Sequence, residues 1–226
     1  MSNVQIFVEG IADQKFFQDL IEKWYNTKLS KGKFADRNTK LEFGDIFDMG
    51  GKDSFEDVSK TSVLDPIIET LRFEDIPMLV IFDADTYVIS KPIIEELCRK
   101  RNFHYFLLPY NGAHSEADKN NGDLEALLQE IICPDNQVIF DCWQAYEECL
   151  IDKPAKTTAS GKFTLPARKT KIYAYLEALV GESKSQKSKI KEENRDYRNP
   201  KHWNLDPTHP PLKPLKEFLD PFFSPP

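Results

Sequence analysis

The sequence predicts an α/β protein with a mostly parallel sheet of about four strands, helices on both faces of the sheet and a helical extension at the C-terminus. Two observations predict this class. Short apolar runs of strand type alternate with stretches whose apolar residues recur at helical spacing, and parallel strands need such crossover connections. The chain has 226 residues, of which 40% are hydrophobic. That composition is sufficient for one globular domain with additions.

The first half of the chain predicts two strands and two helices. A strand is expected at Val4 to Val8, and helical spacing follows from Phe16 to Tyr25. An extended piece is expected around Phe43 to Met49, followed by a Gly-Gly turn. A helix that begins near Ser54 comes next and continues through VLDPIIETLRF, with Pro66 placed in a first turn, where proline is tolerated.

The next part of the chain predicts two more strands, each followed by a helix. PMLVIFDAD, residues 77–85, is the strongest apolar strand, and KPIIEELCRKRN, residues 91–102, is helical. FHYFLLP, residues 103–109, is a further strand, and GDLEALLQEII, residues 122–132, reads as an amphipathic helix. Residues 1–150 are therefore predicted to form the α/β domain.

Residues 151–226 are predicted to form a basic and helical extension that packs on the same domain. A helix is expected from Thr170 to Val180, and the charged stretch after it, rich in Lys, Glu and Ser, is expected to be mobile. The closing segment LKPLKEFLDPFF predicts a helix with an apolar stripe. The stripe consists of Leu212, Leu215, Phe218, Leu219, Phe222 and Phe223.

Charge is unevenly distributed along the chain. The formal net charge of −7 argues against a general nucleic-acid coat. Lys and Arg nevertheless outnumber Asp and Glu between Lys153 and Lys201, so this segment is either a solvated surface or a contact surface for phosphate backbones. The candidate nucleic-acid contacts are Lys184, Lys187, Lys189 and Lys191.

The sequence has no sign of a membrane span or of a cleaved leader. No stretch of about 18 apolar residues occurs, and the N-terminus enters a strand-like run without a basic flank. We therefore expect a cytoplasmic protein without membrane contact. Its four cysteines show no metal-site or disulfide spacing and are interpreted as buried or incidental thiols. Oligomeric state is left open.

Acidic side chains follow two of the predicted strands. Asp83 and Asp85 end the strongest strand, and Glu9 follows the first one. The carboxyl ends of parallel strands meet at one edge of a sheet, and alternate residues of an ideal strand share a face, so all three are expected in one crevice. Each carboxylate pair costs on the order of 4 kcal/mol at about 4 Å and an effective dielectric constant of about 20. A divalent cation with oxygen ligands, Mg²⁺ or Mn²⁺, would relieve this repulsion.

These motifs resemble the Toprim family of topoisomerases, primases, recombination proteins and OLD-type nucleases. The sequence has VEGIADQKFF, then a Gly-Gly turn in DMGGKDSF, then LVIFDAD, in the family's order, over residues 1 to about 132. By this resemblance Glu9, Asp83 and Asp85 are catalytic and bind metal. Glu125 in GDLE and Asp13 join the metal-binding set.

The resemblance implies metal-dependent phosphodiester chemistry on nucleic acid. Lys52, just after the Gly-Gly turn, is the candidate phosphate-binding residue, although it can also be an ordinary solvated lysine. No phosphate-binding loop of the nucleoside-triphosphatase type occurs in the sequence. Nucleases of the OLD type often combine the Toprim fold with an ATPase. The resemblance therefore makes a separate ATPase a candidate partner of this chain.

Several alternatives stay open at this stage. Asp13 and Glu125 can simply complement helix dipoles, and Asp83 can cap a turn. The chain can also be a catalytically silent module of the same fold that binds nucleic acid or an ATPase through its basic segment. A less favoured alternative is a phosphatase of the haloacid-dehalogenase type, in which Asp83 would be the nucleophile. Thr86 stands one place too early for that motif.

Overall fold

The computed structural model shows a mixed sheet of six strands between helices. The structure describes residues 4–35, 40–156, 158, 160–181 and 183–223. The strand order in the sheet is β3-β2-β4-β1-β5-β6. The strands are β1 (Gln5–Val8), β2 (Lys31–Ala35), β3 (Lys40–Glu42), β4 (Ile46–Asp48), β5 (Met78–Asp83) and β6 (His104–Leu108).

The predicted α/β class and the four predicted strands are confirmed, but the count of about four strands was too low. All pairings are parallel except that of β2 with β3, which is antiparallel. The two strands that the sequence did not predict are lysine-rich and short: β2 reads KGKFA and β3 reads KLE. They form the outer end of the sheet, where charged residues are common and apolar runs are not needed.

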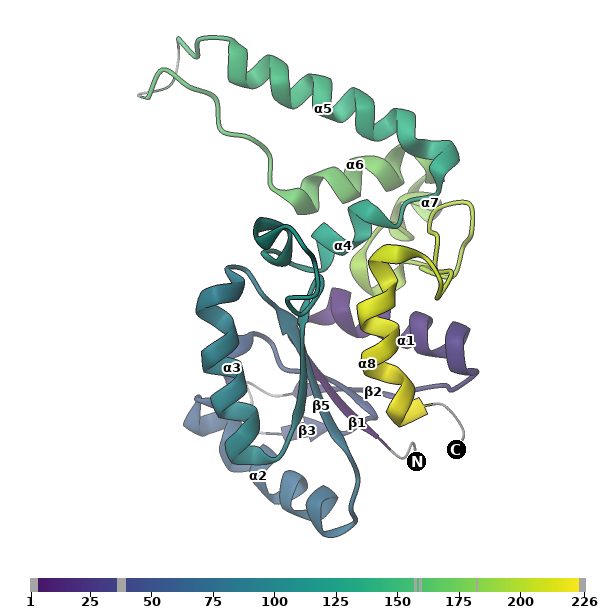
Figure 1. Ribbon diagram of the computed structural model, residues 1–226. Helices are drawn as coiled ribbons and strands as arrows, with labels where there is room; N and C mark the ends of the chain where they lie inside the picture. Colours follow the sequence, from purple (N-terminus) through teal and green to yellow (C-terminus); the bar gives the residue numbers. More distant parts are fainter. Residues whose placement is uncertain (1–3, 36–39, 157, 159, 182, 224–226) are drawn as a thin grey trace.

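Alternate residues of the strands point to opposite faces, and each face has its own core. The helices that cover the sheet are α1 (Ile11–Tyr25), α2 (Val58–Phe73), α3 (Tyr87–Arg101) and α8 (Lys213–Phe223). On one face Ile6, Ile81 and Phe106 pack under α1 and α8; on the other, Phe7 and Phe82 pack under α2 and α3. Figure 1 shows these helix pairs on the two sides of the sheet. Helices on both faces are thereby confirmed.

The helix expected near Ser54 begins later than predicted. Lys52–Phe55 form a short 3-10 turn, η2, and α2 begins at Val58 after the cap Asp57, whose side chain accepts a hydrogen bond from the Ser59 N–H. α2 nevertheless begins eight residues before Pro66, so this proline lies inside the helix and not in a first turn. Its place in the prediction was wrong because the Asp57 cap, which sets the start of the helix, was not recognised.

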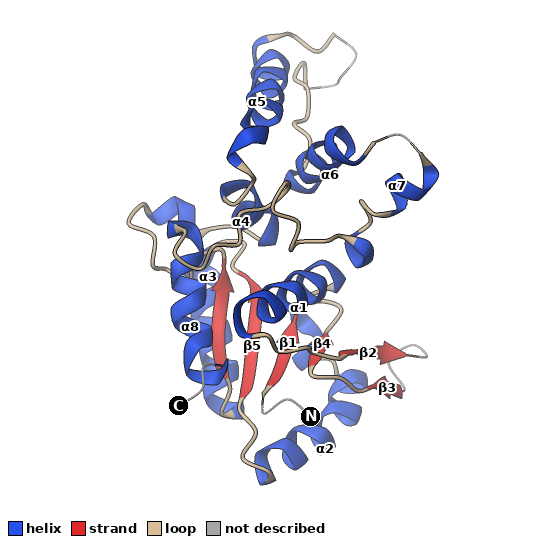
Figure 2. Ribbon diagram, turned by 90° about the vertical axis from the view of Figure 1, so that its right-hand side faces the viewer, coloured by secondary structure: helices blue, strands red, loops and turns tan. Residues whose placement is uncertain are grey.

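Four further helices lie beyond the carboxyl ends of the central strands, as Figures 1 and 2 show. They are α4 (Leu124–Glu130), α5 (Gln137–Asp152), α6 (Arg168–Val180) and α7 (Lys184–Ser188). The predictions of α4 and α6 are confirmed, and α5 was not predicted. The stretch that was expected to be mobile contains α7 and the 3-10 turn η5 (Glu192–Asn194). The Ser183 side chain caps α7 and gives this charged stretch a defined start.

The C-terminal part of the chain contacts both the sheet and α1. Phe218 of α8 packs on Phe106 of β6 with ring centroids 5.3 Å apart. The buried Asp19 carboxylate on α1 accepts a hydrogen bond of 2.9 Å from the Tyr197 N–H. Among the described helices, none has the length and apolarity needed to cross a bilayer. The division of the chain at residue 150 and a cytoplasmic location stay predictions.

Candidate functional site: an acidic cluster at the carboxyl edge of the sheet

Two predicted acids meet at the carboxyl ends of neighbouring central strands. Glu9 follows β1 directly, and Asp83 is the last residue of β5. β1 and β5 pair in parallel, with Val8 opposite Ile81, so their ends lie side by side. The Asp83 backbone N–H donates to Glu9 Oε2 over 3.3 Å. The predicted convergence of these two positions is therefore seen in the structure.

Helix N-termini bring three more acids to the same place. Asp13 lies in the first turn of α1, where its Oδ2 accepts the Gly10 N–H over 3.0 Å. Asp83 Oδ1 accepts the N–H of Leu124, the first residue of α4, over 3.0 Å. The cap Asp123 and Glu125 belong to the same helix start. We call Glu9, Asp13, Asp83, Asp123 and Glu125 the inner acidic cluster.

Burial and mutual repulsion raise the pKa values of Asp83 and Asp13. Burial raises the pKa of Asp83 to about 9, and the charges of Asp13, Glu9, Asp123 and Glu125 act in the same direction. Burial likewise raises the pKa of Asp13 to about 8, with contributions from Glu125 and Glu9. At neutral pH these carboxyls therefore retain protons unless positive charge is brought to them.

Positive charges oppose this effect at two members of the cluster. The pKa of Glu9 is raised, because the effect of burial exceeds the opposite effect of the Lys52 ammonium. The pKa of Glu125 is also raised by burial, and the positive charges of Arg195 and Lys169 reduce this rise. Because Arg195 and Lys169 come from the C-terminal extension, that part of the chain contributes to the electrostatics of the site.

Asp85 does not share a face with Asp83, contrary to the prediction. β5 ends at Asp83, and Asp85 has a φ of 48°, in the left-handed region that aspartate tolerates better than most residues. Its N–H donates to the Gly122 carbonyl over 2.7 Å. The rule of alternate residues applies only to extended backbone, and the Asp85 side chain instead turns outward with 69% of its surface exposed.

Lys52 lies between the inner acidic cluster and Asp85. Its Nζ forms an ion pair with Asp85 Oδ2 and lies 4.0 Å from Glu9 Oε2. The Lys52 side chain is 21% exposed, so it is not the ordinary solvated lysine that was the alternative interpretation. The ammonium marks the place where these carboxylates favour a cation.

The chemistry of the site suits a hard cation, although the side chains are not assembled around one. Carboxylate oxygens are the ligands that Mg²⁺ and Mn²⁺ prefer. Within the residues that the structure describes, no group of three or more His, Cys, Asp or Glu side chains is arranged to hold a metal as it stands. The residues thus fit a divalent metal in donor type and charge, and binding would require the carboxylates to draw together.

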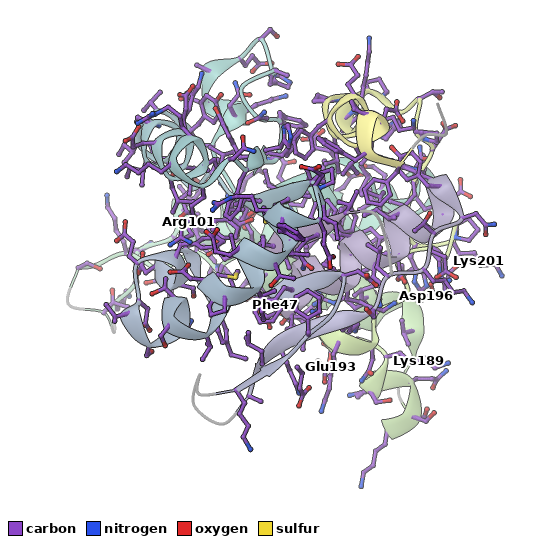
Figure 3. The ribbon with its side chains drawn as sticks, turned by 90° about the horizontal axis from the view of Figure 1, so that it is seen from below. Phe47, Arg101, Lys189, Glu193, Asp196 and Lys201 are labelled. Carbon is purple, nitrogen blue, oxygen red and sulfur yellow. The ribbon has the colours of Figure 1, made fainter. Side chains whose placement is uncertain are left out.

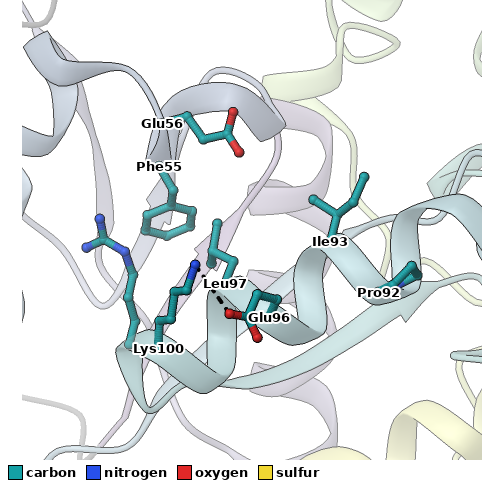
Figure 4. A pocket seen from close by; sticks show the side chains of 8 residues that line it. Phe55, Glu56, Pro92, Ile93, Glu96, Leu97 and Lys100 are labelled. Carbon is teal, nitrogen blue, oxygen red and sulfur yellow. Dashed lines mark ion pairs between the residues drawn. The ribbon is translucent and has the colours of Figure 1, made fainter.

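Two cavities lie beside η2 and α3, and neither is lined by a residue of the inner acidic cluster. A cavity of about 510 Å³ lies between η2 and α3, lined by Phe55, Ile93 and Lys100 among others; Lys100 pairs there with Glu96 (Figure 4). A smaller cavity of about 120 Å³ is lined by Lys52 and by further residues of η2 and α3.

The four predicted nucleic-acid lysines lie on α7 and on the segment after it. None of Lys184, Lys187, Lys189 and Lys191 forms an ion pair with another described residue. Other basic residues of the extension are paired: Lys169 with Glu192, and Arg168 with Asp123 at 3.4 Å. The basic segment therefore has two parts. Arg168 and Lys169 lie next to the inner acidic cluster, whereas the four lysines on and after α7 are exposed to solvent or to a partner.

Sequence reasoning missed Asp123, Arg168 and Arg195. Asp123 had a signal, because Gly-Asp before an apolar run is typical of a helix start. Arg168 and Arg195 had none, because only tertiary packing brings the extension next to the acids of the first domain.

Comparison of the chain with protein-family models, with curated proteins and with solved structures gives no significant match. The Toprim resemblance therefore stays a prediction that rests on the motifs quoted above. The six-stranded α/β fold and the site geometry stand independently of it.

Proposed function

We propose that the inner acidic cluster, together with Asp85 and Lys52, carries out Mg²⁺-dependent or Mn²⁺-dependent phosphodiester chemistry on nucleic acid, as a small Toprim-like nuclease would. One observation carries the proposal: Glu9 and Asp83 follow neighbouring central strands and are joined by a hydrogen bond of 3.3 Å. Five carboxyls at one sheet edge are costly without positive charge. An arrangement of this kind is typical of functional sites.

Each group has a role in the proposed reaction. A bound divalent metal would polarise the phosphoryl group and neutralise charge that develops on it. Glu9, Asp83 and Asp85 would supply the main ligand oxygens for the metal. Asp13 and Glu125 would be further members of the metal-binding set. Glu9, with its raised pKa, can also hold or accept a proton during cleavage. Lys52 is placed to exchange its carboxylate partners for a substrate phosphate.

The test is calorimetry with Mg²⁺ and Mn²⁺ together with cleavage assays on plasmid, single-stranded DNA and RNA. The Asp83→Asn/Asp85→Asn double variant is expected to lose metal binding and to lower cleavage by at least about 100-fold. Asp135→Asn, an exposed acid outside the site, is the matched control and should behave like the natural chain. A natural chain that binds neither metal would contradict the proposal.

An additional assay with a phosphate monoester separates the phosphatase alternative from the proposed nuclease. A phosphatase that uses Asp83 as nucleophile would hydrolyse phosphate monoesters such as p-nitrophenyl phosphate and leave nucleic acid intact. Loss of that activity in Asp83→Asn, with no cleavage of any nucleic acid by the natural chain, would favour that alternative over the proposal.

A second candidate function is a silent module that binds nucleic acid or an ATPase partner. The unpaired, exposed lysines of the α7 segment favour it. Binding to phosphates would weaken steeply as salt rises, whereas a partner held by apolar contacts would be less sensitive. Metal-independent binding that is lost when Lys184, Lys187, Lys189 and Lys191 are all changed to Gln, without any cleavage, would support this candidate.

A further inference from the structure

A cavity of about 310 Å³ lies in the C-terminal extension, between α6, α7 and the segment of residues 194–203. Leu176 and Leu179 give it an apolar wall, and Trp203, Arg195 and Lys189 line it as well. Figure 3 shows Lys189 and Asp196 on the same side of the molecule, away from Arg101. The cavity lies in the extension and is not lined by any residue of the inner acidic cluster. Arg195, which lines it, nevertheless lies close enough to Glu125 to lower the pKa of that carboxyl.

Two buried N–H groups of the lining residues lack an acceptor. Arg195 is 1% exposed; its Nε donates to the Ile190 carbonyl over 2.9 Å, and its Nη1 lies 3.3 Å from the Tyr197 hydroxyl. Its Nη2 has no hydrogen-bond partner in the described part of the chain, and neither has the Nε1 of Trp203, also 1% exposed. Buried donors without partners are rare in native proteins, because a buried N–H that has lost its water and gained no acceptor destabilises the fold.

The charges around the cavity are mainly positive. The Arg195 guanidinium is buried, and Lys189 is exposed and forms no ion pair with another described residue. Asp196 is the acidic residue of the lining, and its carboxylate already lies 3.6 Å from Arg198. Burial lowers the pKa of His202, so this side chain is neutral at pH 7 and adds no charge. Arg195 and Lys189 therefore bring two cations to the cavity lining, where the one acid among the described residues, Asp196, already has Arg198 as a partner. Arg195 also interacts with Glu125, which lies outside the lining.

We propose that this cavity binds a phosphate monoester of about mononucleotide size. A phosphate group carries about −1.5 to −2 charges at pH 7, which matches Arg195 and Lys189 together better than a single carboxylate does. Its oxygens are acceptors for the orphaned N–H groups. The leucines and the Trp203 ring suit a planar base, and the volume is at the small end of known ligand pockets, about 300 to 1,000 Å³.

The test is calorimetric titration of the full chain, without divalent metal, with inorganic phosphate, ribose 5-phosphate, AMP and adenosine. AMP is expected to bind and adenosine to bind at least tenfold more weakly. Ribose 5-phosphate distinguishes recognition of the phosphate alone from recognition of phosphate and base. Lys189→Gln and Trp203→Phe should each weaken AMP binding at least fivefold. The second change keeps an aromatic ring, smaller than the indole, and removes the N–H.

Lys213→Gln is the matched control, because it removes an exposed lysine of the C-terminal extension that neither lines the cavity nor belongs to the candidate nucleic-acid contacts. It should leave the affinity unchanged. No binding of any phosphate compound, or equal loss in Lys213→Gln and Lys189→Gln, would overturn the proposal. Circular dichroism of each variant checks that the fold is kept, and Lys189→Gln, at an exposed position, keeps the test decisive if Trp203→Phe disturbs the core.

Discussion

Asp83 and Asp85 stand two residues apart and have very different electrostatic surroundings. Asp83 lies among other acids at the start of α4, and its pKa is raised by burial. Asp85 is largely exposed and pairs with Lys52. In the proposed reaction they therefore have different tasks: Asp83 takes up positive charge that reaches the interior, and Asp85 holds Lys52 in place until substrate arrives.

At the residue scale the raised pKa values predict a pH dependence of stability. Asp13, with a folded pKa of about 8 against an ordinary 3.8, keeps its proton in the folded chain after the unfolded chain has lost it. The folded state then binds more protons, so the free energy of unfolding falls as pH rises from about 4 to about 8. Without divalent metal, Asp13→Asn should be more stable than the natural chain at pH 8 by about 1 to 3 kcal/mol.

Urea unfolding at several pH values measures this effect. The stability gain of Asp13→Asn should shrink as the pH is lowered toward 4 and below. There the Asp13 carboxyl becomes protonated in the unfolded chain as well, as it already is in the folded chain. Asp135→Asn, at an exposed position, should show no such trend. A gain that is independent of pH would show that the Asp13 carboxyl is not the cause.

The sequence predicted the positions of the site better than their orientation. Glu9 and Asp83 were found because strand ends can be recognised from apolar runs. The outward turn of Asp85 could not be found, because a φ of 48° depends on its hydrogen bond to Gly122, more than thirty residues away. Arg195 could not be placed for the same reason: its neighbour Glu125 belongs to another part of the chain.

At the scale of elements, α8 shows how an apolar stripe closes the sheet. Leu212, Leu215 and Leu219 are fully buried, as the stripe predicted. The rings of Phe218 and Phe222 pack on β6: Phe222 lies 4.8 Å from the His104 ring. A helix from the end of the chain thus covers one face of a sheet built from its beginning.

The burial of α8 predicts a large cost for shortening one of its side chains. Leu219→Ala should lower the free energy of unfolding by about 2 to 5 kcal/mol, because a buried leucine leaves a cavity when it is truncated. Glu217→Ala on the exposed side removes only a surface pair with Lys213 and should change stability by less than about 1 kcal/mol. Urea titration of both variants checks this. Equal effects would mean that α8 does not pack as described.

Other elements were missed for two different reasons. β2 and β3 are paired by their backbones at the outer end of the sheet and carry charged side chains, so they have no apolar run. In α5 the apolar residues do fall on one side of the helix, although Val138, Tyr146 and Ile151 are exposed and, of the residues of this helix, only Phe140 is buried. The spacing of these residues could therefore have predicted α5 from the sequence.

At the scale of the whole molecule, the two predicted parts share one hydrophobic core. Residues of α1 and β1 pack in the same cluster as Tyr197, Trp203 and Leu219 from the extension. The buried Asp19 and the hydrogen bond that it accepts from Tyr197 reinforce this connection. We therefore expect a single cooperative unfolding transition.

Shortening the chain tests this expectation. A chain of residues 1–150 lacks α6 and α8 and should fail to show a cooperative thermal transition, because the first core is left uncovered. A chain that ends at Phe223 keeps α8 and should melt like the full chain. Scanning calorimetry measures both. A cooperative transition in the shorter chain would show that residues 1–150 form an independent domain.

The short antiparallel strand β3 also bears on the behaviour of the protein in concentrated solution. Within the described residues it has three residues at the outer end of the sheet, and Glu42 pairs there with Lys33 at 3.4 Å. A strand from another molecule would find few backbone groups to bond and would have to approach charged side chains. This end of the sheet is thereby protected against the edge-to-edge association that leads to aggregation.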